Sequence, residues 1–358
     1  MKSNYTPILI CFLLLITNVI LSQPLKVGVA GLNHDHAYGL MNQYKNGEVI
    51  ILGIAEPDKE LVQRYKERYQ LPDSIFYSTI SEMLAHIKPD AVLAYNAIAD
   101  HLSVVEACAP KGISVMVEKP LATTVAQVNR MQELVNKYHI KLLTNYETTW
   151  YPTNQQVYQM VNTQHTIGNI RKMIVHDGHQ GPKEIGCSKY FLAWLTDPVK
   201  NGGGALTDFG CYGANLMTWM MNGKAPISVS AITHQMKPNI YPKVDDDATI
   251  LLEYPDATGI IEASWNWPYG IKDMEVFGEK GYLHCLNGNN LQARDTGTYY
   301  NVPVQLYIYK DNLPYLAAVL RGDIHPVNDL SSFENNIIVV RILEAAKESA
   351  KTGKKVML

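Results

Sequence analysis

The 358-residue chain lacks the features that identify several classes of protein. It has no run of basic residues and a net charge of only −3, which argues against a nucleic-acid surface because such surfaces cluster Lys and Arg. Its five cysteines stand far apart without a CxxC pair, so neither a zinc site nor a dense disulfide framework is expected. The remaining composition, 47% apolar and 18% charged, is that of a globular protein with enough length for two domains.

The apolar run that opens the chain is short. Residues 7–21 (PILICFLLLITNVIL) follow one early charge, Lys2, and precede Ser22. This order is typical of a secretory signal peptide, whereas a membrane anchor, the alternative, needs ~20 apolar residues to span the bilayer. We therefore expect residues 1–22 to be a signal peptide, cleaved after about Ser22. The protein is then exported, to the periplasm, with no stable membrane span.

Residues 24–148 have the pattern of a doubly wound α/β domain. Short apolar runs at 25–30, 49–55 and 90–95 alternate with helix-like segments. Continuous apolar strands separated by helices indicate a parallel sheet that is covered on both faces. The sequence thus predicts an N-terminal Rossmann-like domain that binds NAD(P).

The pattern changes in residues 149–358. A helix is predicted from the glycine run at 202–204 to about Met221, and several strands with short connections follow it. Such connections indicate a mainly antiparallel sheet, so we expect these residues to form an α+β domain. An amphipathic helix at 331–351 is expected to return to the first domain.

The expected nucleotide loop keeps one of the three glycines in the G-x-G-x-x-G pattern. Gly31 is present, but the other two positions hold Asn33 and His36. Asn33 tolerates a left-handed backbone, so the tight turn can survive. His36 is bulkier than glycine, and we expect it to loosen the packing of strand on helix. The altered loop puts ordinary cofactor exchange in doubt.

Three further residues near this loop admit two interpretations each. Glu56 ends the second strand, where a carboxylate accepts ribose hydroxyls and repels a 2′-phosphate, which favours NAD over NADP; the alternative is a solvated turn residue. His34 and His36 are two residues apart, as metal ligands can be, but no third ligand is evident, so no metal is predicted. Contact with cofactor or substrate, or plain packing, is expected for them instead.

The reaction site is expected around Glu118-Lys119-Pro120, at the carboxyl end of a buried strand. Ligands bind at that edge of an open α/β sheet, and a lysine there can stabilise an alkoxide as hydride leaves. Asp208 and Tyr212 lie four residues apart on the predicted helix and so share a face. We expect the lysine to acidify the hydroxyl of Tyr212 so that it accepts the substrate proton, while Asp208 orients the sugar or the lysine. A helix-dipole role for Asp208 is the alternative.

These residues resemble those of the glucose–fructose oxidoreductase / inositol dehydrogenase / rhizopine catabolism (Gfo/Idh/MocA) family. The resemblance covers roughly residues 25–350 and is most specific at 117–124 (VEKPLATT) and 202–210 (GGGALTDFG). It implies a Rossmann domain joined to an open-sheet domain that serves substrate binding and oligomerisation. It also implies activity on sugars or polyols, and a catalytic lysine at Lys119 with the helix aspartate at Asp208. The inositol dehydrogenase branch of the family has histidine at the position of Tyr212. In having tyrosine there, this chain is similar to the glucose–fructose oxidoreductase and dihydrodiol dehydrogenase branch. Family members usually have Thr-Pro after the fourth strand, where this chain has Tyr95-Asn96, so we expect different surroundings for the nicotinamide.

The candidate site residues fall into three groups. The catalytic residues are Lys119, Tyr212 and Asp208. The cofactor-binding residues are Gly31, Asn33, His34, His36, Glu56, Tyr95, Asn96, His101 and Glu118. The substrate-binding residues are Lys119, Trp150, His179, Asp208 and Tyr212.

We expect an exported oxidoreductase that transfers hydride between a sugar or glycoside and NAD. Free cofactor should be scarce outside the cytoplasm, so we expect the NAD to stay bound, as it does in the glucose–fructose oxidoreductase branch. One alternative is a glycoside hydrolase or lyase that uses NAD by transient oxidation. Another is a non-catalytic sugar-binding protein of the same fold. A homo-oligomer formed through the open sheet is expected in each case.

Overall fold

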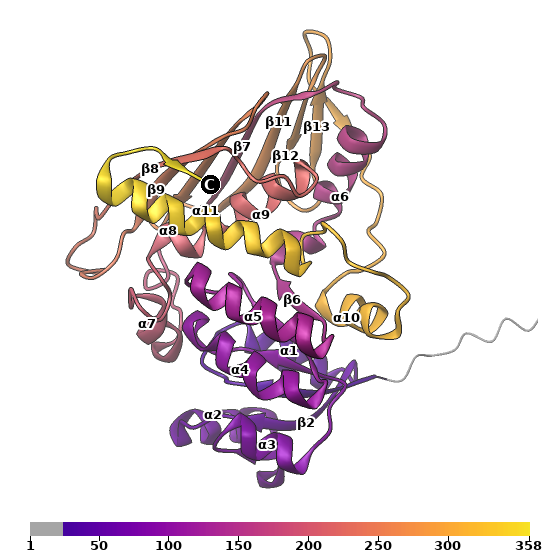
Figure 1. Ribbon diagram of the computed structural model, residues 1–358, viewed down its shortest axis with the longest axis vertical. Helices are drawn as coiled ribbons and strands as arrows, with labels where there is room; N and C mark the ends of the chain where they lie inside the picture. The colour runs from indigo at the N-terminus through magenta and orange to yellow at the C-terminus, as the bar shows by residue number, and fades with distance from the viewer. Residues whose placement is uncertain (1–23) are drawn as a thin grey trace, which may run out of the picture.

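The computed structural model describes residues 24–358, so the expected signal peptide at 1–22 lies outside the described part of the chain. Two α/β domains stand one above the other in Figure 1, with the N-terminal domain below. Within residues 24–358, no helix combines the length and the apolar character needed to cross a membrane.

The first domain is a six-stranded sheet with helices on its faces, as the sequence predicted (Figure 1). Its strands are all parallel, in the order β3-β2-β1-β4-β5-β6. This order reverses between β1 and β4, which is where such sheets bind ligands. The strands are β1 (Leu25–Ala30), β2 (Val49–Ala55), β3 (Phe76–Tyr77), β4 (Ala91–Ala94), β5 (Ser114–Glu118) and β6 (Leu142–Asn145). The helices are α1 (Ala37–Lys45), α2 (Lys59–Tyr69), α3 (Ile80–His86), α4 (His101–Cys108) and α5 (Val125–Tyr138).

The second domain contains a nine-stranded sheet in the order β14-β13-β12-β11-β7-β10-β9-β8-β15. All neighbouring strands are antiparallel except β10 and β7, which are parallel, so the predicted open, mainly antiparallel sheet is confirmed. The strands are β7 (Ile170–Gly178), β8 (Ser228–His234), β9 (Asp247–Glu253), β10 (Thr258–Ser264), β11 (Ile271–Gly278), β12 (Tyr282–Cys285), β13 (Leu291–Arg294), β14 (Tyr300–Val302) and β15 (Val356–Met357). The helices are α6 (Pro152–Tyr158), α7 (Lys189–Leu195), α8 (Ala205–Asp208), α9 (Gly210–Met220), α10 (Asn312–Arg321) and α11 (Phe333–Thr352).

The single helix predicted from the glycine run to Met221 is wrong, because the chain forms two helices, α8 and α9, that are separated at Phe209. The glycine run itself lies against the loop that precedes β9. A Cβ on Gly204 would lie 1.7 Å from the carbonyl oxygen of Asp245, and the Asp245 carboxylate accepts the backbone N–H of Gly204 at 2.8 Å. This contact fixes the start of α8, whose last residue is Asp208.

Helix α11 lies along both domains (Figure 1). It packs against β8 and α9 of the second domain and against α5 and β6 of the first. Its Glu344 carboxylate accepts the backbone N–H of Val125 at 2.8 Å. Just before the helix begins, the backbone carbonyl of Ser331 accepts the backbone N–H of Thr144 at 3.0 Å. These contacts hold the carboxyl edge of the first sheet against the second domain.

Candidate active site

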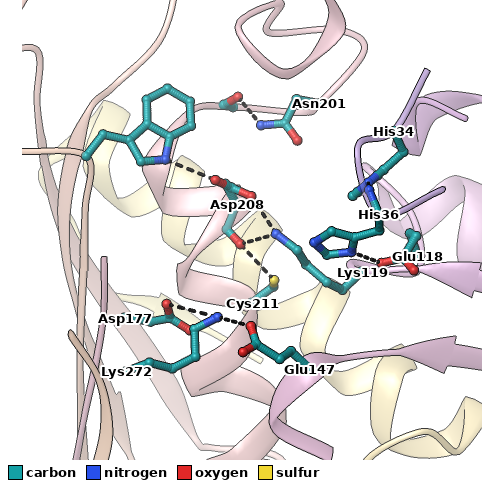
Figure 2. Close-up of polar contacts among 12 residues, drawn as sticks. His34, His36, Glu118, Lys119, Glu147, Asp177, Asn201, Asp208, Cys211 and Lys272 are labelled. Atoms are coloured by element: carbon teal, nitrogen blue, oxygen red, sulfur yellow. Dashed lines mark hydrogen bonds and ion pairs between the residues drawn. The ribbon is translucent and has the colours of Figure 1, made fainter. Parts of the chain in front are cut away.

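A buried ion pair between the two domains forms the centre of the site. Lys119 directly follows β5 and Asp208 ends α8; their side chains are only 6% and 8% exposed. The Lys119 ammonium donates to Asp208 Oδ1 at 2.5 Å and to its backbone carbonyl at 2.9 Å (Figure 2). Burial by itself lowers the pKa of Lys119, but the Asp208 carboxylate raises it above its ordinary value. The pKa of Asp208, which burial would raise, is lowered by Lys119, so both groups are charged.

Trp265 fixes the second oxygen of the aspartate. Its indole Nε1 donates to Asp208 Oδ2 at 3.0 Å, and the residue is fully buried. Sequence reasoning missed this contact because Trp265 follows β10, 57 residues from Asp208, and no local pattern connects them. With both oxygens engaged, Asp208 holds the lysine in place.

Tyr212 lies beside the lysine, but its hydroxyl is not acidified. The ring lies 4.9 Å from Lys119 Nζ and 4.3 Å from Lys272 Nζ, measured to its centroid. Burial raises the pKa of Tyr212 well above its ordinary value, and the carboxylates of Asp177 and Glu147 raise it further. The expectation that a lysine acidifies this hydroxyl is therefore wrong, because burial and carboxylates outweigh the two ammonium groups.

A second charged cluster, which sequence reasoning missed, lies next to the ion pair (Figure 2). Lys272 of β11 donates to Glu147 at 2.7 Å and lies 3.8 Å from Asp177 Oδ1 of β7. Asp177 is 1% exposed, and neither of its oxygens has a hydrogen-bond partner. Burial raises the pKa of Asp177 to about 7, which Lys272 and Lys119 only partly oppose. A group of this pKa can exchange a proton near neutral pH.

The two other residues assigned to substrate line different sides of the interdomain region. His179 follows β7; its ring meets that of Phe209 edge-on at 4.9 Å, and burial lowers its pKa, so the ring is neutral. Trp150 donates from Nε1 to Asn145 at 3.1 Å and lines a cavity of about 450 Å³ at the edge of the first sheet.

The expected nucleotide loop makes its tight turn at Gly31, where φ is +82°. A Cβ at this position would lie 2.7 Å from the Cβ of Asn96. The chain after β1 therefore passes the chain after β4 too closely for any residue but glycine. Glu56 is not a solvated turn residue: it is 5% exposed and accepts the backbone N–H groups of Leu32 at 2.7 Å and Asp58 at 2.9 Å. A ribose-binding role for Glu56 would use its remaining lone pairs and stays a prediction.

Three buried acceptor atoms near this edge lack hydrogen-bond partners. They allow a test of whether a nicotinamide nucleotide fits the site. They are Asn33 Oδ1, Asn96 Oδ1 and His101 Nε2. The other nitrogen of His101 bonds the Leu121 carbonyl at 3.1 Å, and burial lowers the pKa of His101 to about 4, so Nε2 is a free acceptor. Buried acceptors normally have donors, and the hydroxyls and amide of a nicotinamide nucleotide supply them. The residues present fit this group. Tyr95 is buried beside them, and its carbonyl accepts the N–H of His34 at 3.0 Å.

The segment that carries α7 covers the nucleotide loop from the second domain. The backbone N–H of Ser188 donates to Asp35 at 2.8 Å, and the Trp194 indole donates to the carbonyl of Asn33 at 3.1 Å. Phe191 lies with its ring centroid 4.6 Å from that of His34. A group bound on this loop would thus be overlaid by residues of the second domain.

The two histidines of the loop lie on the side of Glu118. The Nδ1 atom of His36 is 2.8 Å from Glu118 Oε2, while His34 is 1% exposed. Burial is the main reason that the pKa of His34 lies well below its ordinary value. Burial would raise the pKa of Glu118, but His36 and Asn145 lower it overall. No local pattern predicts that Glu118 contacts these histidines, because it is 82 residues from His36.

Family models match both halves of the chain. Residues 25–146 match "Oxidoreductase family, NAD-binding Rossmann fold", and residues 154–284 match "GFO/IDH/MocA C-terminal domain". Among curated proteins, trans-1,2-dihydrobenzene-1,2-diol dehydrogenase of Xenopus tropicalis is 25% identical over 235 residues, 65% of this chain and 66% of the relative. The human enzyme of that name is 22% identical over 240 residues, 66% of each chain. The chain thus spans just under two thirds of the length of these relatives.

Solved structures share the fold across both domains. The aldose-aldose oxidoreductase of Caulobacter crescentus, complexed with glycerol, superposes with a TM-score of 0.79 at 21% identity, covering 94% of this chain and all of the other. An inositol dehydrogenase homologue of Azotobacter vinelandii, complexed with NAD+, superposes with a TM-score of 0.77 at 17% identity, covering 94% and 98%. At these identities the likeness establishes the architecture alone.

Proposed function

The chain belongs to the GFO/IDH/MocA family of oxidoreductases, and from this premise we propose that it transfers hydride between a carbohydrate hydroxyl or carbonyl and a bound NAD. The observation that carries the proposal is the buried Lys119–Asp208 pair, which lies beside the unpartnered acceptors of the nucleotide edge. The curated relatives are dehydrogenases that, by name, act on a diol, and a sugar presents the same vicinal hydroxyls.

When bound, the nicotinamide supplies the hydride acceptor. The ammonium of Lys119 stabilises the oxygen of the reacting C–O group as negative charge develops on it. Asp208 keeps that ammonium charged and in place, because both of its oxygens are already engaged by Lys119 and Trp265. Asn33, Asn96, His101 and Glu56 are the residues that would hold the cofactor.

The proton of the substrate hydroxyl needs an acceptor other than Tyr212. The raised pKa of Tyr212 keeps its hydroxyl protonated at neutral pH, so we assign it to hydrogen bonding with the substrate. Asp177 has a pKa of about 7 and two unpartnered oxygens, which suits a group that accepts this proton and returns it in the reverse reaction. Lys272 holds the ionised form.

Turnover tests this proposal directly. Reduction of the bound nicotinamide is followed at 340 nm as each member of a panel of aldoses, polyols and glycosides is added, comparing the wild type with Lys119→Ala and with Lys88→Ala, an exposed lysine on the first domain. We expect activity in the wild type and Lys88→Ala and a loss of at least roughly 100-fold in Lys119→Ala. Full activity in Lys119→Ala would refute the assignment.

Export and retention of the cofactor are parts of the same proposal. The contacts of Ser188 and Trp194 with the nucleotide loop support retention, since release requires them to open. Native mass spectrometry of unsupplemented protein from an exporting host measures cofactor occupancy, chain number and the cleaved mass together. Protein without nicotinamide and with an uncleaved N-terminus would contradict both parts.

One observation favours a second candidate, a glycoside hydrolase or lyase that uses NAD by transient oxidation. Elimination requires an acid or base besides the groups at the oxidised carbon, and Asp177 with Glu147 provides carboxyl groups for it. Release of phenol from aryl glycosides without added NAD distinguishes this reaction from simple dehydrogenation.

We also propose that the chain forms a homo-oligomer through the open sheet. Ile232 of β8 and Leu251 of β9 are 63% and 44% exposed, and the register places them on one face of the sheet. Light scattering of the purified chain, with Ile232→Lys as the variant, measures whether this face is an interface.

A further inference from the structure

The fold gathers three side chains with metal-binding atoms at the edge of the first domain. His34 and His36 belong to the loop after β1, and Glu118 ends β5 (Figure 2). Each offers one ligand atom, and the three atoms lie within 4.8 Å of one another. Two imidazoles and one carboxylate form a ligand set that binds divalent metals and leaves coordination positions open. The geometry points to a site for one divalent transition-metal ion at His34, His36 and Glu118, which goes beyond the hydride transfer proposed above.

Burial makes a cation at this position favourable. Glu118 is 2% exposed and His34 is 1% exposed, so the carboxylate and this imidazole are both removed from water. The neighbouring ammonium of Lys119 does not neutralise it, because that group is already paired with Asp208. Its present partner is His36, whose Nδ1 lies 2.8 Å from Oε2, and a divalent ion held by the adjacent imidazoles would bring a larger positive charge to the buried carboxylate.

Only small movements are needed to close the site. Metal–ligand bonds of about 2.0–2.2 Å place neighbouring ligand atoms roughly 3.4 Å apart in a tetrahedral site. His36 Nδ1 and Glu118 Oε2, now at 2.8 Å, must separate slightly, and the 45% exposure of the His36 side chain leaves it room to do so. His34 must approach them. Its Nδ1 accepts the backbone N–H of His36 at 3.1 Å, and a metal bound through this nitrogen would replace that hydrogen bond.

Supporting contacts orient the carboxylate. Asn145 donates to Glu118 Oε1 at 2.8 Å, which leaves Oε2 directed at His36, and Trp150 in turn donates to Asn145. Such outer partners typically fix metal ligands in place. The same residues line the cavity of about 450 Å³ at this edge, so the open coordination positions face it. Hydroxyl or carboxylate oxygens of a polar ligand in that cavity are the donors that would complete the coordination.

Metal content is the direct test. The purified full chain is stripped with a chelator, loaded with Zn²⁺, Mn²⁺ or Co²⁺, desalted and analysed for its elements. We expect about one ion per chain and, with Co²⁺, a visible absorption band of nitrogen-ligated cobalt. Glu118→Gln and His36→Gln should abolish stoichiometric binding, and Asn145→Ala should weaken it roughly 10–100-fold. Neither Gln substitution changes the size of the side chain much, so folding is checked by circular dichroism.

The matched control is His86→Gln, an exposed histidine on α3, which should bind metal as the wild type does. Less than about one tenth of an ion in the loaded wild type, or equal binding in the wild type, Glu118→Gln and His36→Gln, would overturn the proposal. Nicotinamide content of the same samples is read by mass spectrometry. Metal content and NAD content are therefore measured separately, so failure of the metal proposal can be distinguished from failure of the proposed hydride transfer.

Discussion

Removing the charge of Asp208 without removing its shape tests the central ion pair. In Asp208→Asn the ammonium of Lys119, only 6% exposed, stays buried without its partner. Across 2.5 Å the attraction is roughly 7 kcal/mol at an effective dielectric constant of about 20, and desolvation cancels part of it. Breaking such a buried pair costs about 3–5 kcal/mol. We expect this loss in the free energy of unfolding at pH 7, measured by urea denaturation with circular dichroism.

The loss should depend on pH in a direction that identifies the lysine. In the wild type the raised pKa of Lys119 contributes stability that is present below its ordinary pKa and lost as pH rises through the folded value. In Asp208→Asn burial, which lowers the pKa of Lys119, is unopposed, so the difference from the wild type shrinks towards about pH 10. A double variant, Lys119→Met with Asp208→Asn, should regain part of the loss.

The control is Asp100→Asn, which leaves Lys200 without its partner on the surface, where the two side chains are 44% and 51% exposed. It should cost at most about 1 kcal/mol. If Asp208→Asn costs no more than this control, or if its deficit is the same at both pH values, the argument from a buried charged pair is refuted.

Four further predictions concern Asp177, Gly204 and Trp194. Activity of the wild type should rise with pH through about 7 as Asp177 ionises, and Asp177→Asn should lose that limb; an unchanged pH profile would exclude Asp177 as the proton acceptor. The raised pKa of Asp177 also means that wild-type stability falls as pH rises from about 4 to 7, a slope that the same variant should reduce in urea titrations. Gly204→Ala should destabilise by at least about 1–3 kcal/mol because its Cβ meets a carbonyl, whereas Gly297→Ala, with open space, should stay within about 0.5 kcal/mol of the wild type in the same assay. Trp194→Ala removes the bond to Asn33 and should speed dissociation of bound nicotinamide in dilution experiments; equal rates would remove α7 from the account of retention.

Local patterns predicted most of the fold. Apolar runs separated by helices indicated β1, β2 and β4 within a residue or so, because a strand in a covered parallel sheet reads as a continuous apolar segment. The break at Phe209 was not predicted, since it depends on the approach of Gly204 to Asp245, 41 residues away. The strands β12, β13 and β14 were missed as well, because short strands near the end of a sheet carry few apolar positions.

The site was predictable in its centre and not in its surroundings. Lys119 and Asp208 stand in recognisable motifs, and the structure brings them into contact. Trp265, Lys272 and Asp177 act on this pair from the second sheet, and nothing near them in the sequence indicates it. The sequence predicts no metal there for want of a third ligand, and the candidate third ligand of the proposed site, Glu118, lies beside the histidines only because β1 and β5 both pair with β4.

Helix α11 has a consequence for the order in which the protein is made. Phe333, Ile337 and Val340 on this helix belong to the same apolar core as the strands and helices of the first domain. The N-terminal domain therefore remains incomplete on the ribosome until nearly the whole chain has been synthesised. A fragment that ends before residue 331 should expose this core and aggregate, although it contains every strand of the N-terminal sheet.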